Sequence, residues 1–355
     1  MKIALVYDRV NKWGGAERVL TTLHEIFPDA PLFTAVYSPE KAKWAKIFSK
    51  VIPSFLQKIP FMQERHELLG ALTPLAFESF DLTGFDLVIS VTSEAAKGII
   101  TKPGTLHICY CLTPTRYLWS GYDLYFPKGS RIRRWAQKVV SYLRKWDKIA
   151  AHRPDVMVGI SNAVKDRISK YYGRDSLVIF PPVDVEKFKA KDVARENFFL
   201  LVGRLVNYKR ADLAVKAFNK LGLPLIVVGT GSEERKLKRM AKDNIKFVGE
   251  LTDAKLADYY RRCKGLIFPQ EEDFGIVTLE AQAAGAPVIA YKAGGALDTV
   301  IDGETGVFFE RQTVPDLIKA VERLERLTFR QEDLISNAEK FSKEKFKREF
   351  SKLVK

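Results

Sequence analysis

The sequence has few of the residues that build covalent or metal-bound frameworks. Its 355 residues include only three cysteines, Cys109, Cys111 and Cys263, and four histidines. The cysteines have neither the even count of a disulfide framework nor the spacing of a zinc site. Cys109 and Cys111 are two residues apart on an expected strand, so we interpret them as core thiols on one face. This cysteine usage indicates a reducing compartment, and we expect the protein in the cytoplasm.

Long apolar runs are also missing. No stretch approaches the roughly 18 uninterrupted apolar residues of a membrane-spanning helix. The first apolar run, Ile3–Tyr7, is followed by Asp8, so it is too short for the core of a secretory signal and suits a buried strand. The hydrophobic share of 46% is that of a folded globular protein.

Acidic residues are outnumbered. The 58 Lys and Arg residues against 43 Asp and Glu residues give a net charge of +15. Such an excess predicts an anionic partner, which could be nucleic acid, acidic lipid or a phosphorylated ligand. The sequence contains no recognisable RNA- or DNA-binding module, so we expect no nucleic-acid partner.

Short apolar runs alternate with amphipathic helical patterns along both halves. This alternation predicts an α/β protein with two doubly wound parallel sheets. The joint is expected at Phe180–Asp184, where two consecutive prolines demand extended chain, which gives domains 1–182 and 183–335. The expected strands are Ile3–Tyr7, Leu32–Val36, Leu87–Val91, His107–Cys111, Val156–Ile160, Leu177–Phe180, Phe198–Val202, Leu225–Val228, Ile245–Val248, Gly265–Phe268, Pro287–Ala290 and Gly306–Phe309.

Two acids, Glu272 and Glu280, stand eight residues apart around Gly275. Eight residues of helix would separate them by about 12 Å, more than the roughly 5–10 Å between paired hydrolase carboxylates. They therefore suit opposite ends of one elongated ligand, such as a nucleotide sugar. Gly275 lets the backbone approach a ligand, and the helix start offers free N–H groups. The alternative is a pair of solvated acids flanking a helix start.

Two strand-to-helix turns indicate anion binding. Gly203, Arg204 and Lys209 follow one expected strand and precede a helix, where a guanidinium, an ammonium and the helix dipole could hold a diphosphate. Gly14 and Gly15 follow the first expected strand but lack the G-x-G-x-x-G spacing of a dinucleotide site. The alternatives are surface cations and a tight turn without a ligand. The turn at Gly229-Thr230-Gly231 is a weaker signal, placed where a base or phosphate edge could lie.

Three motifs together resemble a known family. Gly14–Glu17, the GRLxxxK run at Gly203–Lys209 and the E-x7-E run at Glu272–Glu280 are similar to those of the retaining GT-B glycosyltransferases of family four. Thr113–Trp119, with Arg116, most resembles bacterial O-antigen-type mannosyltransferases that use GDP-mannose. Further stretches that fit the pattern are Ala284–Ala290, Gly294-Gly295 and Asp302–Gly306.

The resemblance implies two Rossmann-like domains facing across a cleft, an N-terminal acceptor domain and a C-terminal donor domain. It implies that residues 336–355 pack back on the first domain. No metal is expected, and the sequence has no isolated D-x-D site; cationic side chains and helix ends would do a metal's electrostatic work.

The resemblance also implies a role for each motif residue. Arg204 and Lys209 would hold the donor diphosphate, and Glu280 the ribose hydroxyls. Glu272 and the backbone of residues 273–275 would hold the donor sugar. The implied catalytic residues are Glu272, Arg204 and Lys209. The implied donor-binding residues are Gly14, Gly15, Gly203, Arg204, Lys209, Gly229, Glu272, Asp273, Phe274, Gly275 and Glu280. Arg116 is placed on the acceptor side.

One position departs from the family. Related mannosyltransferases carry His-x-Pro-x-Arg where this sequence has Leu112-Thr113-Pro114-Thr115-Arg116. Leu112 cannot form the hydrogen bond expected of that histidine, so the sugar is held otherwise, the donor differs, or activity is low. We interpret His107 as a satisfied core histidine and assign no function to the remaining histidines, His24, His66 and His152.

The stretch Arg131–Arg153 predicts an amphipathic helix with eight basic residues and one acid, Asp147. Its apolar positions are Ile132, Trp135, Val139, Leu143, Trp146 and Ile149. Such a helix is typical of an anionic membrane surface, although an ordinary domain helix with a basic face has the same pattern. Trp44–Phe61 is a second candidate. A lipid-linked glycan acceptor at the cytoplasmic face of the cell membrane would account for both patches.

Three functions follow for testing. The leading one is a metal-independent retaining transferase that moves a hexose from a nucleotide-diphosphate sugar to a lipid-linked or polysaccharide glycan. Mannose is the favoured hexose and GDP-mannose the favoured donor. The second is a catalytically weak GT-B relative that docks on membranes as a binding protein. A Rossmann oxidoreductase is the third, and the missing dinucleotide fingerprint argues against it.

Overall fold

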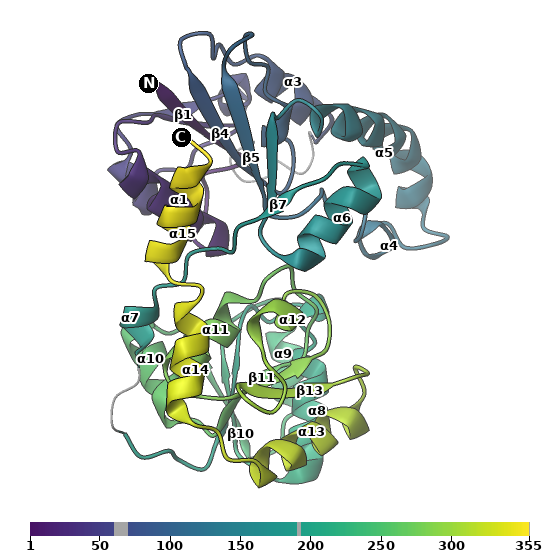
Figure 1. Ribbon diagram of the computed structural model, residues 1–355. Coiled ribbons are helices and arrows are strands. Elements are labelled where there is room, and N and C mark those ends of the chain that lie inside the picture. Colours follow the sequence, from purple (N-terminus) through teal and green to yellow (C-terminus); the bar gives the residue numbers. More distant parts are fainter. Residues whose placement is uncertain (60–69, 190–192, 355) are drawn as a thin grey trace. The chain divides into compact units, whose positions relative to one another are not determined.

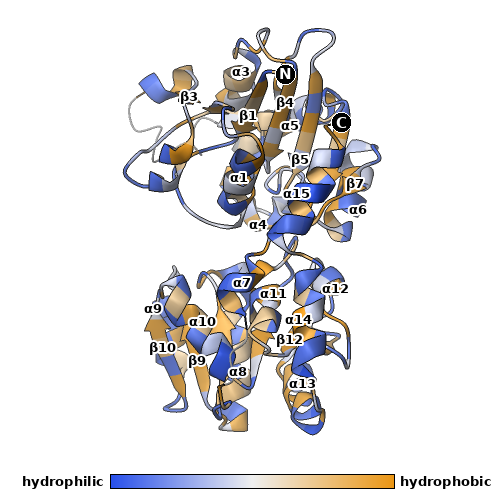
Figure 2. Cartoon of the chain, turned by 60° about the vertical axis from the view of Figure 1, so that its left-hand side comes forward, coloured by the Kyte–Doolittle hydropathy of each residue, from blue (hydrophilic) through white to orange (hydrophobic). Residues whose placement is uncertain are grey.

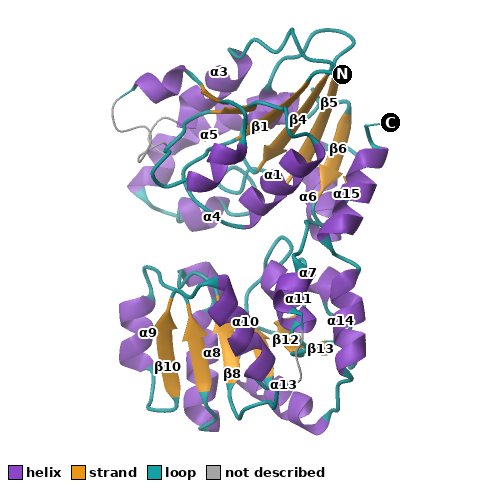
Figure 3. Ribbon diagram, turned by 90° about the vertical axis from the view of Figure 1, so that its left-hand side faces the viewer, coloured by secondary structure: helices purple, strands orange, loops and turns teal. Residues whose placement is uncertain are grey.

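The structure is a computed structural model that describes residues 1–59, 70–189 and 193–354. The chain divides into two compact units, Met1–Phe180 with Glu349–Lys355, and Pro181–Arg348 (Figure 1). The first proline of the expected joint opens the second unit. Each unit is an α/β domain built on one parallel sheet, with helices on both faces (Figure 3).

The first unit has a seven-stranded sheet in the order β3-β2-β1-β4-β5-β6-β7, with every pair parallel. Its strands are β1 (Ile3–Tyr7), β2 (Leu32–Thr34), β3 (Val51–Pro53), β4 (Leu87–Thr92), β5 (Leu106–Cys111), β6 (Val156–Gly159) and β7 (Leu177–Val178). The central strands β4 and β5 are buried on both faces because helices cover both, as in other parallel sheets. Cys109 and Cys111 on β5 are buried free thiols, so the core interpretation is confirmed.

The helices of the first unit fill the crossovers between its strands. They are α1 (Gly15–Ile26), η1 (Lys43–Ile47), η2 (Phe55–Lys58), α3 (Thr73–Glu78), η4 (Ala96–Gly98), α4 (Tyr122–Tyr125), α5 (Arg131–Ala150) and α6 (Asn162–Tyr172). Side-chain caps fix three of these starts, since Ser54 accepts from Leu56 N, Ser130 from Arg133 N and Ser161 from Val164 N.

The second unit has a six-stranded parallel sheet in the order β10-β9-β8-β11-β12-β13. Its strands are β8 (Phe199–Val202), β9 (Leu225–Val228), β10 (Ile245–Gly249), β11 (Gly265–Phe268), β12 (Val288–Tyr291) and β13 (Gly306–Phe309). Its helices are α7 (Val185–Phe188), η5 (Asn207–Lys209), α8 (Ala211–Leu221), α9 (Glu234–Met240), α10 (Asp253–Arg262), α11 (Ile276–Ala283), α12 (Ala296–Thr299), α13 (Val314–Arg326) and α14 (Gln331–Glu339).

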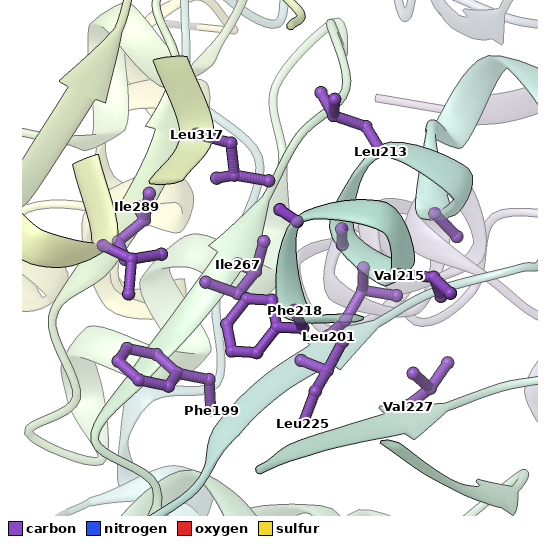
Figure 4. Packing of buried hydrophobic residues seen from close by; sticks show 14 of the residues in the cluster. Phe199, Leu201, Leu213, Val215, Phe218, Leu225, Val227, Ile267, Ile289 and Leu317 are labelled. Carbon is purple, nitrogen blue, oxygen red and sulfur yellow. The ribbon is translucent and has the colours of Figure 1, made fainter. Parts of the chain in front are cut away.

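The core of the second unit lies between one face of its sheet and helices α8 and α13. Phe199 and Ile267 from the strands contact Phe218 from α8, and Leu317 comes from α13 (Figure 4). All four side chains are buried, and burying each stabilises the fold by about 1.5–3 kcal/mol. Figure 2 shows the same division, with hydrophobic colour on the strands and hydrophilic colour on exposed helix faces.

The C-terminal residues do not form one helix. α14 ends at Glu339, and the last helix, α15, spans Lys343–Lys352. Of residues 336–355, which the resemblance places on the first domain, those up to Arg348 group with the second unit, whereas Glu349–Lys355 group with the first. There, the Phe350 ring lies 6.2 Å from the Tyr110 ring.

The prediction of an amphipathic helix at Trp44–Phe61 is wrong. This stretch contains η1, the edge strand β3 and η2, separated by turns. Phe48 and Leu56 are core residues, and the Trp44 indole donates to Lys12 O at 2.7 Å. Phe48 therefore serves packing, whereas Phe55 is exposed, and the two do not form one stripe. Phe61, like His66, lies outside the described residues.

The predicted stripe on α5 is divided between two environments. Leu143 is buried, and the Trp146 indole donates to Glu78 Oε1 at 2.7 Å. Ile132, Val139 and Ile149 are exposed. The periodicity indicates the helix correctly, but it cannot separate the side chains that face the core from those that face solvent.

Candidate active site

The predicted donor motifs lie at the carboxyl ends of β8 and β11, the two central strands of the second sheet. The strand order reverses between β8 and β11, since β8 leads outward to β9 and β10 while β11 leads outward to β12 and β13. In doubly wound sheets, ligands bind outside the carboxyl ends of the strands at this switch point. The loop 203–210 follows β8 and the loop 269–275 follows β11, so the fold places both motifs beside this point.

The two loops are joined by an ion pair between Lys209 Nζ and Glu272. Both side chains are mostly buried, with exposed fractions of 17% and 20%. Gln270 Nε2 also donates to Glu272 Oε1, at 3.4 Å. The structure thus brings together two of the three predicted catalytic residues, from motifs that lie far apart in the sequence.

Arg204 lies in the same loop as Lys209. Its Nη2 donates to the Tyr208 hydroxyl at 3.0 Å, and Lys209 Nζ lies 5.7 Å from the centre of the Tyr208 ring. Tyr208 therefore contacts both predicted diphosphate-binding cations, a role that the sequence pattern did not indicate. Backbone hydrogen bonds connect the carboxyl ends of β8, β9 and β10. Gly203 N donates to Val228 O at 3.0 Å, and Gly229 N donates to Gly249 O at 2.8 Å.

The loop 269–275 is fixed by glycines that permit close approach. Gly275 begins α11 with φ 88°, a left-handed conformation, and a Cβ there would lie 2.8 Å from the Phe268 ring. A Cβ on Gly295 would lie 2.3 Å from Phe274 Cα, and Gly295 N donates to Glu272 O at 2.8 Å. Phe274 is buried, with its ring 5.8 Å from that of Phe341. The backbone around Glu272 and Asp273 is therefore held rigidly.

Glu280 lies on the second turn of α11 and is almost fully buried. Its Oε2 accepts a hydrogen bond from the Tyr260 hydroxyl of α10 at 3.1 Å. The helix is anchored from its other side, because Thr278 Oγ1 donates to Thr299 and Gln282 Nε2 donates to Thr299 O. The carboxylate of Glu280 is thus placed by a helix with little freedom to move.

One link in the site was missed by the sequence. Arg210 has φ 53° and precedes α8. Its Nη1 donates to Gln312 Oε1 at 3.0 Å, and Gln312 Nε2 donates to Pro269 O at 2.8 Å. The pair connects the loops after β8, β11 and β13. No motif marks Gln312, which lies about 100 residues downstream, so only the fold could reveal it.

The glycine motif of the first unit lies at the start of α1. Gly14 is the N-cap of α1 and Gly15 its first residue. Glu17, two residues on, is buried and accepts a hydrogen bond from the Tyr7 hydroxyl at 2.6 Å. Burial raises the pKa of Glu17 above its ordinary value, against the hydrogen bond from Tyr7. Glu17 therefore anchors the helix to β1, a role that the sequence did not assign.

The predicted acceptor-side residue Arg116 follows β5 in a turn, where its carbonyl oxygen accepts from Gly121 N at 2.8 Å. Leu112, the departure from the family pattern, directly follows β5 and donates its N–H to Thr92 O at 2.8 Å. Both side chains are half-buried.

His107 is a core residue, as expected, but only one ring nitrogen is satisfied. Its Nε2 lies 2.9 Å from Ser90 Oγ, and within the described ranges Nδ1 has no partner. Complete burial lowers the pKa of His107 to about 3, so the ring is neutral. His152 Nδ1 lies 2.8 Å from Lys148 O, and the His24 ring packs on that of Phe48.

Two negative findings complete the geometry. In the described part of the chain, no group of three or more His, Cys, Asp or Glu side chains could hold a metal ion. Among the same residues, no helix combines the length and apolarity needed to cross a membrane.

Residues 183–341, nearly the whole second unit, match the family model described as "Glycosyl transferases group 1". An uncharacterised glycosyltransferase of Methanocaldococcus jannaschii is 28% identical over 206 residues, covering 56% of this chain and 58% of the relative. A GDP-mannose-dependent α-(1-6)-phosphatidylinositol monomannoside mannosyltransferase of Mycobacterium tuberculosis is 29% identical over 201 residues, 48% of this chain and 52% of the relative. The chain spans about half the length of the curated relatives it matches.

Solved structures resemble the whole chain. The HepE protein of Anabaena, solved in complex with UDP, superposes with a TM-score of 0.72 at 18% identity, covering 100% of this chain and 99% of that one. Sucrose-phosphate synthase of Thermosynechococcus elongatus gives a TM-score of 0.75 at 18% identity, covering 100% and 98%. The predicted fold class is therefore confirmed: the chain has the GT-B fold, with two parallel-sheet α/β domains.

Proposed function

We propose that this chain is a glycosyltransferase that moves a hexose from a nucleotide-diphosphate sugar to a glycan acceptor. The observation that carries the proposal is the Lys209–Glu272 pair, placed at the switch point of a unit whose sequence matches group 1 glycosyl transferases. A cation and a carboxylate side by side suit the two parts of such a donor, its diphosphate and its sugar hydroxyls.

In this proposal, the donor diphosphate replaces Glu272 as the partner of Lys209. Arg204 adds a planar fork of donors, and both cations stabilise the negative charge that grows on the departing nucleotide. The bond between the sugar C1 and the diphosphate oxygen breaks, a bond from C1 to the acceptor oxygen forms, and the proton of the acceptor hydroxyl passes to the departing diphosphate.

Glu272, released from Lys209, accepts hydrogen bonds from the donor sugar, and Glu280 from the ribose. Gly203 and Gly229, at the ends of β8 and β9, and the backbone of residues 273–275 complete the donor-binding set. In the first unit, Gly14 and Gly15 contact the donor phosphates, and Arg116 acts on the acceptor side. We propose no metal cofactor, because the cations supply the charge.

Within this class, we favour mannose transferred from GDP-mannose with retention of configuration. The motif resemblance and the GDP-mannose-dependent relative support this choice. The HepE complex with UDP makes a uridine donor the competing possibility.

We propose that the acceptor is lipid-linked and that the protein works at an anionic membrane surface, as a peripheral protein of the cytoplasmic face. Exposed Ile132, Val139 and Ile149 on α5, next to basic residues such as Lys138 and Lys145, support this part. The net charge of +15 agrees in sign with such a surface.

The competing function is a catalytically weak relative that only binds membranes, and Leu112 favours it. The two are separated by incubating the protein with GDP-mannose or UDP-glucose and a membrane extract, and measuring release of the nucleoside diphosphate. Release that depends on the extract and is lost in Lys209→Ala supports the transferase. No release with either donor favours the binding protein.

A further inference from the structure

Tyr208 contacts both cations of the loop that follows β8. Its hydroxyl accepts a hydrogen bond from Arg204 Nη2 at 3.0 Å, and its ring centre lies 5.7 Å from Lys209 Nζ. The guanidinium and the ammonium therefore meet two different parts of one half-buried side chain, the hydroxyl and the ring. The motif resemblance gives a role to the two cations and none to the tyrosine that they share.

The backbone of the loop fixes the place of Tyr208. Leu205 is buried, and its N–H donates to Thr230 O at 2.8 Å, which joins this loop to the loop that follows β9. Tyr208 is the middle residue of η5, a 3₁₀ turn in which Lys209 N donates to Val206 O at 3.0 Å. The phenol thus has its position before any ligand binds.

The other end of the turn is anchored as well. Arg210 has φ 53°, a conformation that is uncommon for a residue other than glycine. Its Nη1 donates to Gln312 Oε1 at 3.0 Å, and Gln312 Nε2 donates to Pro269 O at 2.8 Å. Since the backbone is held on both sides of Tyr208, the ring can serve as a fixed support for the cations beside it.

Arg204 gains more from such a support than Lys209 does. Arg204 is exposed, whereas the Lys209 side chain is 17% exposed and paired with Glu272. A long exposed side chain loses conformational freedom when a ligand orders it, and this loss weakens binding. Because the Tyr208 hydroxyl orients the guanidinium in advance, part of the ordering precedes binding.

Two cations held at fixed places suit a ligand with two anionic groups. The guanidinium offers a planar fork of donors, and the ammonium offers a point charge. Once one phosphate of a diphosphate is bound, the other meets the second cation at a high effective concentration, provided that the spacing of the cations is correct. A monophosphate has one group for both cations and gains less from their spacing.

We propose that Tyr208 is a positioning residue that holds Arg204 and Lys209 as a pair, so that the site selects a nucleoside diphosphate over a nucleoside monophosphate. The inference rests on the proposed transferase function, in which these cations bind the donor diphosphate. Tyr208 acts through the cations, since its hydroxyl orients Arg204 and its ring lies beside Lys209. The selection is independent of the base, because guanosine and uridine donors share the diphosphate.

The test measures the Kd of GDP, GMP, UDP and UMP by titration calorimetry. Tyr208→Phe removes the hydroxyl and keeps the ring, and Tyr208→Leu removes both. Tyr259→Phe is the matched control, because Tyr259 is a half-buried tyrosine on α10 of the same unit whose ring centre lies 5.2 Å from the Arg262 guanidinium.

The parent should bind the diphosphates more tightly than the monophosphates. Tyr208→Phe should reduce the ratio of the two affinities about 5-fold, the typical contribution of one hydrogen bond. Tyr208→Leu should reduce it at least as strongly, because the ring beside Lys209 is lost as well. Tyr259→Phe should keep the ratio of the parent. A general loss of folding lowers the binding stoichiometry or weakens all four nucleotides alike, so the ratio separates positioning from a merely structural role.

A double-mutant cycle tests whether Tyr208 acts through Arg204. In the Arg204→Ala background, Tyr208→Phe should change the diphosphate Kd by less than about 2-fold, because the group that it orients is already absent. A full-sized further loss in that background overturns the proposal, as does an unchanged ratio in Tyr208→Phe. A parent that binds nucleotides without preferring the diphosphates also overturns it. If no nucleotide binds the parent, the proposed function fails first and this inference fails with it.

Discussion

At the residue scale, the proposed donor site depends on the ion pair between Lys209 and Glu272. Lys209 is held by Glu272 and lies near Tyr208, so its ammonium is positioned before any phosphate binds. Pre-positioning reduces the ordering that binding would otherwise require. Because of the same ion pair, the donor diphosphate must compete with the Glu272 carboxylate for Lys209.

Replacing Lys209 should therefore weaken nucleotide binding while the protein still folds. We expect Lys209→Ala to lower affinity for GDP at least about 10-fold, since hydrogen bonds to charged groups contribute roughly 1.5–3 kcal/mol. Lys216→Ala, a half-exposed lysine on α8, is the control and should bind as the parent does. Titration calorimetry measures both, and equal affinities for all three proteins would remove Lys209 from the site.

Asp147 permits a second prediction, on stability. Asp147→Ala leaves Lys97 buried without its charge partner and should lower the free energy of unfolding by about 3–5 kcal/mol. Glu310→Ala breaks the exposed pair with Lys292 and should cost at most about 1 kcal/mol. Urea unfolding compares the two, and losses of similar size would show that the buried pair does not hold α5.

Glu17 gives a pH prediction whose sign follows from its raised pKa. The folded state binds the Glu17 proton more tightly than the unfolded state, so this residue favours folding at low pH. This stabilisation starts to decline as the pH rises past 4.5, the ordinary pKa of a glutamate. It is lost once the pH exceeds the raised pKa that Glu17 has in the folded protein. Glu17→Gln should flatten this part of the stability curve in urea titrations from pH 4 to 8. A curve identical to that of the parent would contradict the account.

At the element scale, the sequence predicted twelve of the strands close to their observed limits. β9, β11 and β13 agree at both ends, because a continuous apolar run and a following glycine or polar turn mark them clearly. β3 was missed, since Val51–Pro53 is short and lies at the sheet edge, where it is only half-buried. Periodicity carries little information over three residues.

The candidate site was predictable only where a motif marks it. The spacing of Glu272 and Glu280 indicated two separate ligand contacts, and the structure places one in a loop and the other on a buried helix turn. The Arg210–Gln312 hydrogen bond and the hydrogen bond that the Asp8 carboxylate accepts from Ala95 N join segments that lie far apart in the sequence. Nothing in the local sequence distinguishes these side chains from solvated polar residues.

The exposed side of α5 allows a prediction for membrane binding. The double change Ile132→Asn with Ile149→Asn should weaken binding to vesicles that contain phosphatidylserine, because both side chains are exposed and free to enter the interface. Leu297→Asn, at an exposed site on α12 of the second unit, is the control. Flotation with anionic and neutral vesicles measures the effect. Unchanged flotation of the double variant would show that α5 does not contact lipid.

At the scale of the whole molecule, two sheets of the same design carry different chemistry. The switch point of the second unit has cations beside a carboxylate, which suits a nucleotide sugar. That of the first unit has the buried Asp8 carboxylate, which accepts hydrogen bonds from the backbone of the loop that follows β4. The overall charge of +15 is compatible with an anionic donor and an anionic surface.

The most direct test of the central claim is thermal unfolding in the presence of GDP, UDP, ADP and their sugar conjugates. A ligand at about one hundred times its dissociation constant should stabilise the fold by roughly 2.7 kcal/mol. We expect one nucleotide family to raise the melting temperature of the parent, GDP-mannose foremost, and Arg204→Ala and Glu280→Ala to lose the shift while remaining folded. If no nucleotide shifts the parent, the second unit does not bind a nucleotide sugar and the transferase account is wrong.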